Sequence, residues 1–224
     1  MMRQWIVPEW HAPGRVRAFV TTRPVDMKHN RAVVRAHLPS EPRWMRQVHG
    51  AGVALLDDLA PGHVPEADAA IASQPGVVAV VLTADCMPVF LCDDDGTRVA
   101  VAHAGWRGAA AGVIENTVAA MKCAPGKVMA WLGPAIGPAS FEVGGEVRDA
   151  FLANDPGAGA AFVPGEQPGK FMADLYLLGR RRLERAGVTR IHGGGFDTFN
   201  DTRRFFSYRR GNDGGRMGAF IWLE

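Results

Sequence analysis

Cysteine is scarce in this chain of 224 residues. The three cysteines, Cys86, Cys92 and Cys123, form an odd set without CxxC spacing, which argues against a disulfide framework and suits a reducing compartment. Cys92 lies inside an expected strand and Cys123 at the end of an expected helix. We therefore assign these two to packing and keep Cys86 as the chemical candidate.

The sequence also lacks long apolar runs. No stretch approaches the length needed to cross a membrane. Residues 1–8 have neither the apolar core nor the small-residue cleavage site of a signal peptide. We therefore expect a cytoplasmic protein without a membrane partner.

A charge excess of either sign is missing as well. Lys and Arg number 25 against 23 Asp and Glu, a net charge of +2, so bulk charge gives no case for a nucleic-acid partner. Arginines cluster only at 180–182, 203–204 and 209–210. The guanidinium fork matches phosphate and carboxylate, although the first cluster falls on the outer face of an expected helix and predicts a solvated surface.

No internal repeat or low-complexity segment interrupts the chain, and its length predicts one domain over residues 1–224. Short apolar strands alternate with a few helices, which predicts an α/β (α+β) fold with helices outside a mixed sheet. Strands are expected at 16–22, 53–56, 77–82, 89–92, 99–102, 128–132, 188–192 and 218–223. Helices are expected at 109–123, 146–152 and 171–186, a loop with at most a short helix at 23–42, and a mobile segment at 154–169.

Three side chains capable of chemistry lie next to short apolar strands. His49, Cys86 and His103 each sit beside glycine, proline or arginine, at the polar end of a predicted strand. Two imidazoles and a thiolate suffice for a zinc ion with an open coordination position, or for a Cys/His nucleophile pair. Their spacing matches no short zinc signature, so the residues alone leave both alternatives open.

Six ordered motifs and one short sequel carry a family resemblance. They are QVHG (47–50), ADA (67–69), TADCMP (83–88), HAGWRG (103–108), GPAIG (133–137) and FFSYRR (205–210), followed by GRM (215–217). From Phe19 to Leu223 the chain resembles the laccase-domain family. Those proteins were first named multicopper polyphenol oxidoreductases and are now regarded as purine nucleoside phosphorylases with adenosine deaminase activity.

The resemblance implies a single domain of mixed sheets sandwiched between helices, of the type shared with cytotoxic-necrotising-factor-like cysteine hydrolases. It implies zinc, with copper as the other candidate, bound by His49, Cys86 and His103. It also implies phosphorolysis of adenosine, inosine or methylthioadenosine, together with deamination of adenosine. A three-ligand zinc site lowers the pKa of bound water toward ~7, which suits deamination.

Further residues receive expected roles through the same resemblance. Arg107, Arg209 and Arg210 are candidates for the phosphate subsite, and Tyr208, Phe205 or Phe206 for stacking on a purine. If 209 and 210 belong to an extended segment, only one of the two arginines faces the cleft. The expected catalytic set is Cys86, His103, Arg107 and Asp85, where Asp85 acts as a general base or orients its neighbour Cys86.

The chain departs from the family pattern in three segments. Residues 23–44 are short and lack the Gly-Gly-x-Ser and Asn-Leu elements, while residues 139–141 and 196–198 lack the usual Cys-Tyr and Cys-Thr pairs. These departures bear on substrate preference more than on the metal.

Three rival functions remain. A metal-free amide hydrolase would use Cys86 as nucleophile and His103 as base, and the family resemblance implies peptidoglycan precursors as its substrates. A copper-dependent polyphenol oxidoreductase (laccase) is disfavoured, because one Cys and two His cannot build a trinuclear cluster beside a blue site. A non-catalytic metal-storage or interaction module is the third.

Overall fold

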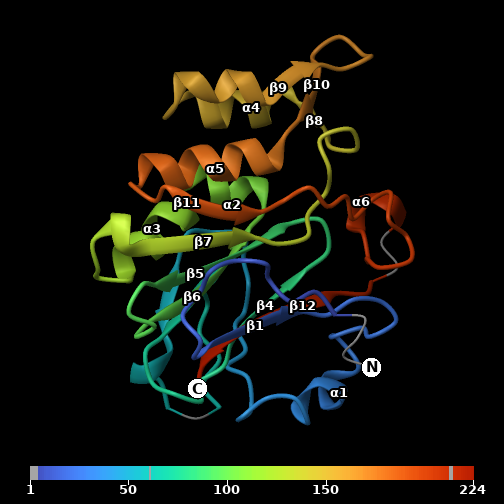
Figure 1. Cartoon of the computed structure of the whole chain (residues 1–224). Helices are drawn as coiled ribbons and strands as arrows, with labels where there is room; N and C mark the ends of the chain where they lie inside the picture. The colour runs from blue at the N-terminus through green and yellow to red at the C-terminus, as the bar shows by residue number, and fades with distance from the viewer. Residues whose placement is uncertain (1–4, 61, 212–213) are drawn as a thin grey trace.

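A six-stranded mixed sheet forms the centre of the molecule (Figure 1). The computed structural model describes residues 5–60, 62–211 and 214–224 and gives the order β11-β7-β5-β6-β3-β2. The strands are β2 (Val53–Leu55), β3 (Ala69–Ala72), β5 (Met87–Asp93), β6 (Val99–Ala104), β7 (Val128–Leu132) and β11 (Arg190–Gly193). The strands β5 and β6 are buried at every position, which explains why their sequences are continuously apolar.

Three segments for which the sequence made a prediction include residues that the structure does not describe. They are residues 1–4 of the amino-terminal segment, residue 61 of a predicted loop, and residues 212–213 of the glycine-rich turn before the last strand.

The predicted hairpin of β5 and β6 is confirmed. The strands pair antiparallel, with Met87 opposite Ala104 and Pro88 opposite His103. The carboxylate of Asp93 is buried and accepts the backbone N–H groups of residues 97 and 98, which closes the acidic turn. At the other end of the hairpin, this register places the residue before β5, Cys86, beside the last residues of β6.

A smaller antiparallel sheet packs on one face of the central sheet. Its order is β1-β12-β4, from β1 (Val16–Val20), β12 (Met217–Leu223) and β4 (Ala79–Thr83). Phe90 and Trp131 of the central sheet are buried against Val81 and Ile221 of the smaller one. Alternate residues of β4, such as Val80, point away from the central sheet into another hydrophobic cluster. The strand β4 is therefore buried on both faces, as predicted.

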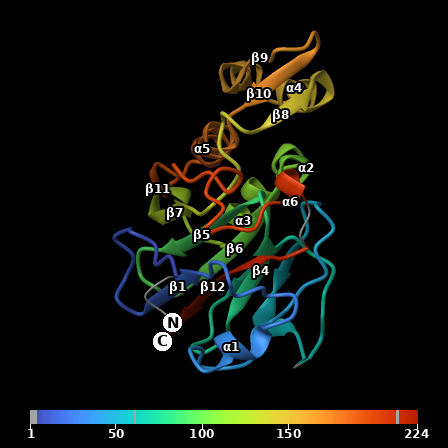
Figure 2. The ribbon, with the colours of Figure 1, turned by 90° about the vertical axis from the view of Figure 1, so that its right-hand side faces the viewer.

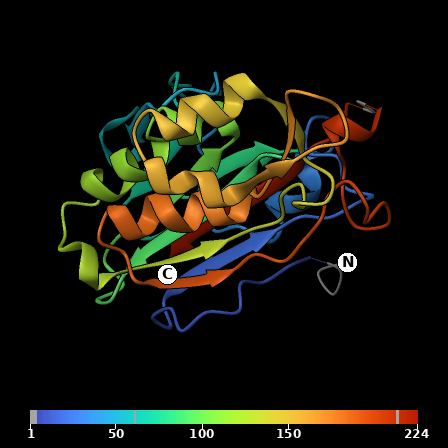
Figure 3. The same cartoon turned by 90° about the horizontal axis from the view of Figure 1, so that it is seen from above.

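Helices cover the outer faces of this pair of sheets (Figures 1 and 3). The helices α2 (Trp106–Ala110), α3 (Val113–Ala120) and α5 (Leu175–Arg185) pack on the free face of the central sheet. On the opposite side, α1 (Arg31–Arg35) contributes Val34 to the cluster beneath the smaller sheet. The mixed α/β fold with sheets between helices is therefore confirmed.

A third sheet with its own helix lies beyond α5 (Figure 2). It comprises β8 (Glu142–Gly144), β10 (Lys170–Ala173) and β9 (Phe162–Pro164), in that order. In the chain, α4 (Gly145–Leu152) and the 3-10 helix η4 (Pro156–Ala161) lie between β8 and β9. The segment 154–169, expected to be mobile, contains η4 and β9. Asp155 accepts the N–H of Gly157 and pairs with Arg181, which fixes the start of η4.

Two predicted helices have different boundaries. The segment 109–123 divides into α2 and α3, because Gly112 takes the left-handed conformation with φ +94. The segment 171–186 begins as β10, and α5 begins only after Asp174, whose carboxylate accepts the N–H of Leu177 at 2.9 Å. Three one-turn elements complete the described chain: η2 (Leu56–Asp58), η3 (Pro125–Lys127) and α6 (Tyr208–Gly211).

The arginine run on α5 is not a solvated face. Arg182 is buried and pairs with Glu115 of α3 at 3.0 Å. Arg181 makes a bidentate contact with Asp155, with both distances 2.8 Å, and Arg180 donates to backbone carbonyls of β11. The run therefore fastens α5 to its neighbours.

Within the described residues, no helix is both long and apolar enough to cross a membrane.

Candidate active site

Asp68 organises the loop that carries the first histidine. Its carboxylate is fully buried and accepts the backbone N–H groups of Val48, His49 and Gly50 at 3.1, 2.9 and 2.7 Å. These bonds hold a tight turn in which His49 has φ +60. The imidazole of His49 is thereby presented on an ordered loop ahead of β2.

The same carboxylate orients the second histidine. Nδ1 of His103 lies 2.9 Å from Oδ1 of Asp68. Because an ionised carboxylate only accepts, His103 donates from Nδ1, and Nε2 is the nitrogen that can act as a ligand or base once it is deprotonated. One buried aspartate therefore sets the positions of both imidazoles.

Cys86 lies in the turn between β4 and β5, close to the end of β6. A Cβ at position 105 would lie 2.7 Å from the Cys86 Sγ. Glycine at 105 thus permits the close approach of the chain after His103 to the thiol.

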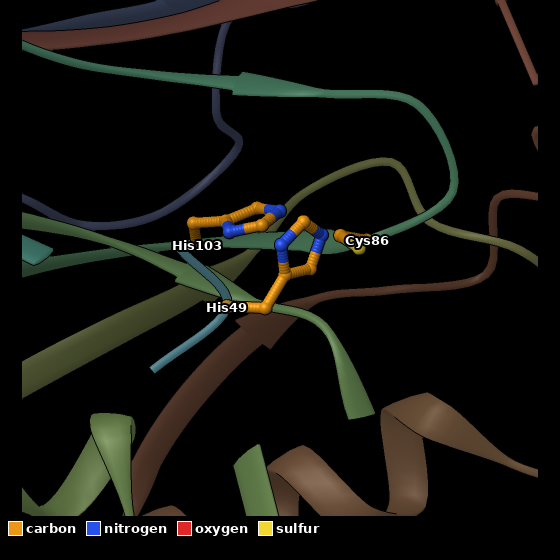
Figure 4. Close-up of side chains that lie close together, drawn as sticks. All are labelled: His49, Cys86 and His103. Atoms are coloured by element: carbon orange, nitrogen blue, oxygen red, sulfur yellow. The ribbon is translucent and has the colours of Figure 1, made fainter. Parts of the chain in front are cut away.

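The three side chains point toward one another (Figure 4). One donor atom from each of His49, Cys86 and His103 can be chosen so that all lie within 4.8 Å of one another. In the part of the chain that the structure describes, this is the only cluster of at least three His, Cys, Asp or Glu residues arranged to hold a metal ion. The convergence predicted from the sequence is present.

Charge coupling favours a thiolate beside an imidazolium. Burial alone would raise the pKa of the Cys86 thiol, but the charge of His103 and hydrogen bonds with both histidines lower this pKa to about 6. Burial likewise opposes the charge on His103, while the Cys86 thiolate and Asp68 raise its pKa. The pKa of Asp68 is lowered because its hydrogen bonds outweigh its burial.

This donor set fits zinc. Donors around a tetrahedral zinc with bonds of about 2.0–2.3 Å are roughly 3.5 Å apart, so small side-chain rotations bring the three atoms onto one ion. The hydrogen bond from His103 to Asp68 is the outer support that metal-bound histidines usually have.

The three residues line a cleft of about 920 Å³, a size suited to a small-molecule substrate. Its other lining residues include apolar, aromatic and cationic side chains: Ile136, Phe141, Val147, Leu175, Trp106, Tyr208, Lys28, Arg107, Lys170, Arg209 and Arg216.

Comparison with known proteins identifies the family. Residues 18–224 match the sequence model described as "Multi-copper polyphenol oxidoreductase laccase". The chain belongs to this family.

Relatives of this laccase-domain chain carry the name purine nucleoside phosphorylase. One from Pseudomonas aeruginosa is 48% identical over an alignment of 244 positions that covers 100% of both chains. YfiH of Escherichia coli is 44% identical, with 99% of this chain and 100% of its own length aligned. Both alignments are longer than the 224 residues here, so these relatives carry residues that this chain lacks.

Solved structures of the family share the whole fold. A Neisseria meningitidis protein, NMB0706, is 41% identical with a TM-score of 0.91 over 99% of both chains. YlmD from Geobacillus stearothermophilus is 26% identical with a TM-score of 0.85 over 100% of this chain and 97% of its own.

Among the arginines expected to bind an anion, two line the cleft. Arg107 is exposed and its guanidinium lies 4.5 Å from the ring centroid of Trp106. Arg209 donates from Nη1 to the carbonyl of Glu142 at 2.7 Å. The guanidinium of Arg210 is instead occupied by the carbonyls of residues 198, 199 and 205.

The segment with the two arginines is helical, not extended. Tyr208 begins α6 and is 60% exposed at the cleft. Phe205 and Phe206 are buried in the core between the central sheet and the sheet of β1, β12 and β4. Of the three aromatic candidates for a purine, the structure therefore brings only Tyr208 to the cleft.

Asp85 lies beside Cys86 in sequence, but its carboxylate serves another partner. It accepts the hydroxyls of Thr198 and Ser207 at 2.6 and 3.0 Å and the N–H of Arg209 at 2.7 Å. The group that orients His49 and His103 is Asp68, to which no chemical role was assigned from the sequence.

Two site residues were missed by the sequence reasoning although they lie in its quoted motifs. Asp68 is the middle residue of the ADA motif, and Trp106 of the HAGWRG motif lines the cleft. An acidic residue between two alanines before an apolar strand was the available signal for Asp68.

The two departures at 139–141 and 196–198 contact each other. The hydroxyl of Ser140 donates to Asp197 at 2.6 Å, and Asp197 also accepts the N–H of Gly137 at 3.1 Å. These contacts close the loop beside Phe141 without any cysteine.

Proposed function

We propose that this protein is a zinc-dependent purine nucleoside phosphorylase acting on adenosine, inosine or methylthioadenosine, with adenosine deaminase activity as a second reaction. The observation that carries the proposal is the His49-Cys86-His103 cluster opening into a cleft that Arg107 and Arg209 also line. The names of its relatives supply the substrate class. A cytoplasmic location and one catalytic domain over residues 1–224 are parts of the same proposal.

The residues of the metal cluster would hold zinc from three directions. When bound, zinc supplies a Lewis acid with one free coordination position. Asp68 keeps Nδ1 of His103 protonated, so that Nε2 stays directed at the cluster. The turn at His49 is kept in place by its three N–H bonds to the same carboxylate.

The cationic and aromatic residues of the cleft would bind the two substrates. A guanidinium binds phosphate with two parallel hydrogen bonds, and Arg107 and Arg209 are exposed residues that line the cleft, which suits them to this. Trp106 and Tyr208 offer flat apolar faces for a purine. In phosphorolysis a phosphate oxygen forms a bond to ribose C1′ while the bond from C1′ to the base breaks.

The decisive experiment is an assay of free-base release from adenosine and inosine with and without phosphate. We expect release only with phosphate, accompanied by equimolar ribose 1-phosphate. Equal release in both conditions would exclude phosphorolysis. Ammonia without free base would leave only the deaminase.

A specific observation also favours a second candidate, the metal-free amide hydrolase. Cys86, His103 and Asp68 form the order of nucleophile, base and orienting carboxylate found in cysteine hydrolases. Activity of chelator-treated protein on peptidoglycan-type amides, abolished by alkylation of Cys86, would support it. Loss of that activity with the metal would oppose it.

A further inference from the structure

Asp85 combines three features. It is a non-glycine residue with φ +82, it is only 9% exposed, and its carboxylate reaches across the cleft wall to the segment 198–209. A left-handed conformation at a buried non-glycine residue persists only where its surroundings enforce it. The strained turn directs the carboxylate toward α6, while the next residue presents its thiol to the metal cluster.

The carboxylate is occupied in a way that does not suit a general base. Oδ2 accepts both Ser207 Oγ and Arg209 N, and Oδ1 accepts Thr198 Oγ1. The two lone pairs of Oδ2 are thereby used. Its contacts are those of a group that holds other residues in place.

What Asp85 holds is the start of α6. This helix has four residues, Tyr208–Gly211, too few to persist without outside support. Asp85 accepts the N–H of Arg209, the second residue of the helix, and accepts the hydroxyl of Ser207, which in turn accepts the N–H of Arg210 at 3.1 Å. A carboxylate at this end also complements the helix dipole.

Arg209 is fixed at both ends by these contacts. Its backbone N–H is bound to Asp85, and its guanidinium donates to the carbonyl of Glu142 and lies 5.5 Å from the ring centroid of Phe141. The guanidinium lines the same cleft as Cys86. The peptide unit joining Asp85 to Cys86 therefore connects the metal cluster to the arginine.

We propose that Asp85 is the positioning residue of an anion subsite: through the start of α6 it holds the Arg209 guanidinium in the cleft that His49, Cys86 and His103 also line, and this guanidinium binds inorganic phosphate. This inference rests on the proposed phosphorylase function and adds the residue that sets the distance between phosphate and the metal-bound region. Asp85 itself touches neither substrate.

The test is a double-mutant cycle on phosphate binding, with Asp85→Asn, Arg209→Lys and the double variant. Calorimetry gives the phosphate Kd, and assays give KM for nucleoside separately. We expect Asp85→Asn to weaken phosphate binding about tenfold and to change nucleoside KM less than twofold. Since Asp85 acts through Arg209, the double variant should bind phosphate no more than about twofold more weakly than Arg209→Lys.

Two further variants guard against a folding defect. Thr198→Val removes one donor to Asp85 but keeps its charge, and should weaken phosphate binding about threefold in the same direction. Asp155→Asn removes a similarly buried capping carboxylate that is not among the residues lining the cleft. It should lower the melting temperature and leave the phosphate Kd unchanged.

The outcomes separate this inference from the proposed function. Additive effects in the double variant, equal losses for nucleoside and phosphate, or unchanged phosphate binding in Asp85→Asn and Thr198→Val would overturn the positioning role. Wild-type protein that binds phosphate, shows the coupling and yet performs no phosphorolysis would overturn the function alone. Wild-type protein that binds no phosphate would overturn both.

Discussion

At the level of single residues, the donor atoms of the cluster differ in how firmly they are held. His103 is buried and bonded to Asp68, whereas His49 is exposed and ordered chiefly through its backbone. Cys86 contributes the one soft, charged donor. Loss of the thiolate or of His103 should therefore damage metal binding more than loss of His49.

We predict that about one zinc ion per chain co-purifies and that Cys86→Ser or His103→Ala reduces occupancy sharply, because two remaining ligands bind zinc weakly. Metal analysis of protein purified without added metal measures this. Cys123→Ser is the matched control, since this cysteine lies outside the cluster. Full zinc content in both cluster variants would contradict the ligand assignment.

The thiol of Cys86 should be reactive at low pH once metal is stripped. Its pKa is lowered to about 6, whereas burial raises those of Cys92, to about 12, and Cys123. Since the thiolate is the nucleophile, the rate of iodoacetamide alkylation at Cys86 should stay high as pH falls from 9 and decline only through about 6. Mass spectrometry of the labelled peptides resolves the three cysteines.

Asp68→Asn tests the cause of that low pKa. Removing the carboxylate charge disfavours the imidazolium of His103, and a less charged His103 stabilises the thiolate less. The midpoint of Cys86 alkylation should therefore move to higher pH. An unchanged midpoint would show that Asp68 does not control the pair.

At the level of elements, the packing of α5 on α3 depends on a mostly buried ion pair that could not be predicted from the sequence of α5. Arg182 pairs with Glu115 of α3, and Oε2 of Glu115 has no hydrogen-bond partner in the described structure. Arg182→Ala would leave both oxygens of a mostly buried carboxylate unpaired. We expect a loss of about 2 kcal/mol in the free energy of unfolding, measured by urea denaturation.

Arg185→Ala on the same helix is the control for Arg182→Ala. The side chain of Arg185 is 50% exposed and lies 3.5 Å from Asp155, so its removal should cost less than about 1 kcal/mol. Equal losses in the two variants would contradict the special role of Arg182.

Strands were easier to predict than helix limits. The apolar runs of β4, β5, β6, β7 and β12 are continuous because these strands are buried on both faces. Helix limits depended on single residues whose effect is local: the left-handed Gly112 splits one helix, and the cap at Asp174 delays another. The order of segments 154–164 depends on the distant Arg181, which local composition could not indicate.

The candidate site likewise contains residues that the sequence could indicate and residues that it could not. The convergence of His49, Cys86 and His103 was predictable, because all three are reactive side chains expected at strand ends. The roles of Asp68 and Asp85 were not, because each is defined by hydrogen bonds to residues far away in sequence. Periodicity reports which face a side chain occupies but not which distant donor it meets.

For the whole molecule, the metal cluster joins the loop before β2, the turn between β4 and β5, and the end of β6. A ligand that binds only the folded chain stabilises it by about 4 kcal/mol at a thousandfold excess over Kd. For a domain of this size that corresponds to roughly 10 °C in melting temperature.

We therefore expect wild-type protein to melt roughly 10 °C lower after chelation and to recover when zinc is restored. Cys86→Ser should melt at one temperature with or without chelator, because it has lost the site that responds. If chelation removes the metal from wild-type protein without lowering its melting temperature, the ion is not bound by the three converging segments, and the assignment of the cluster fails independently of any assay of activity.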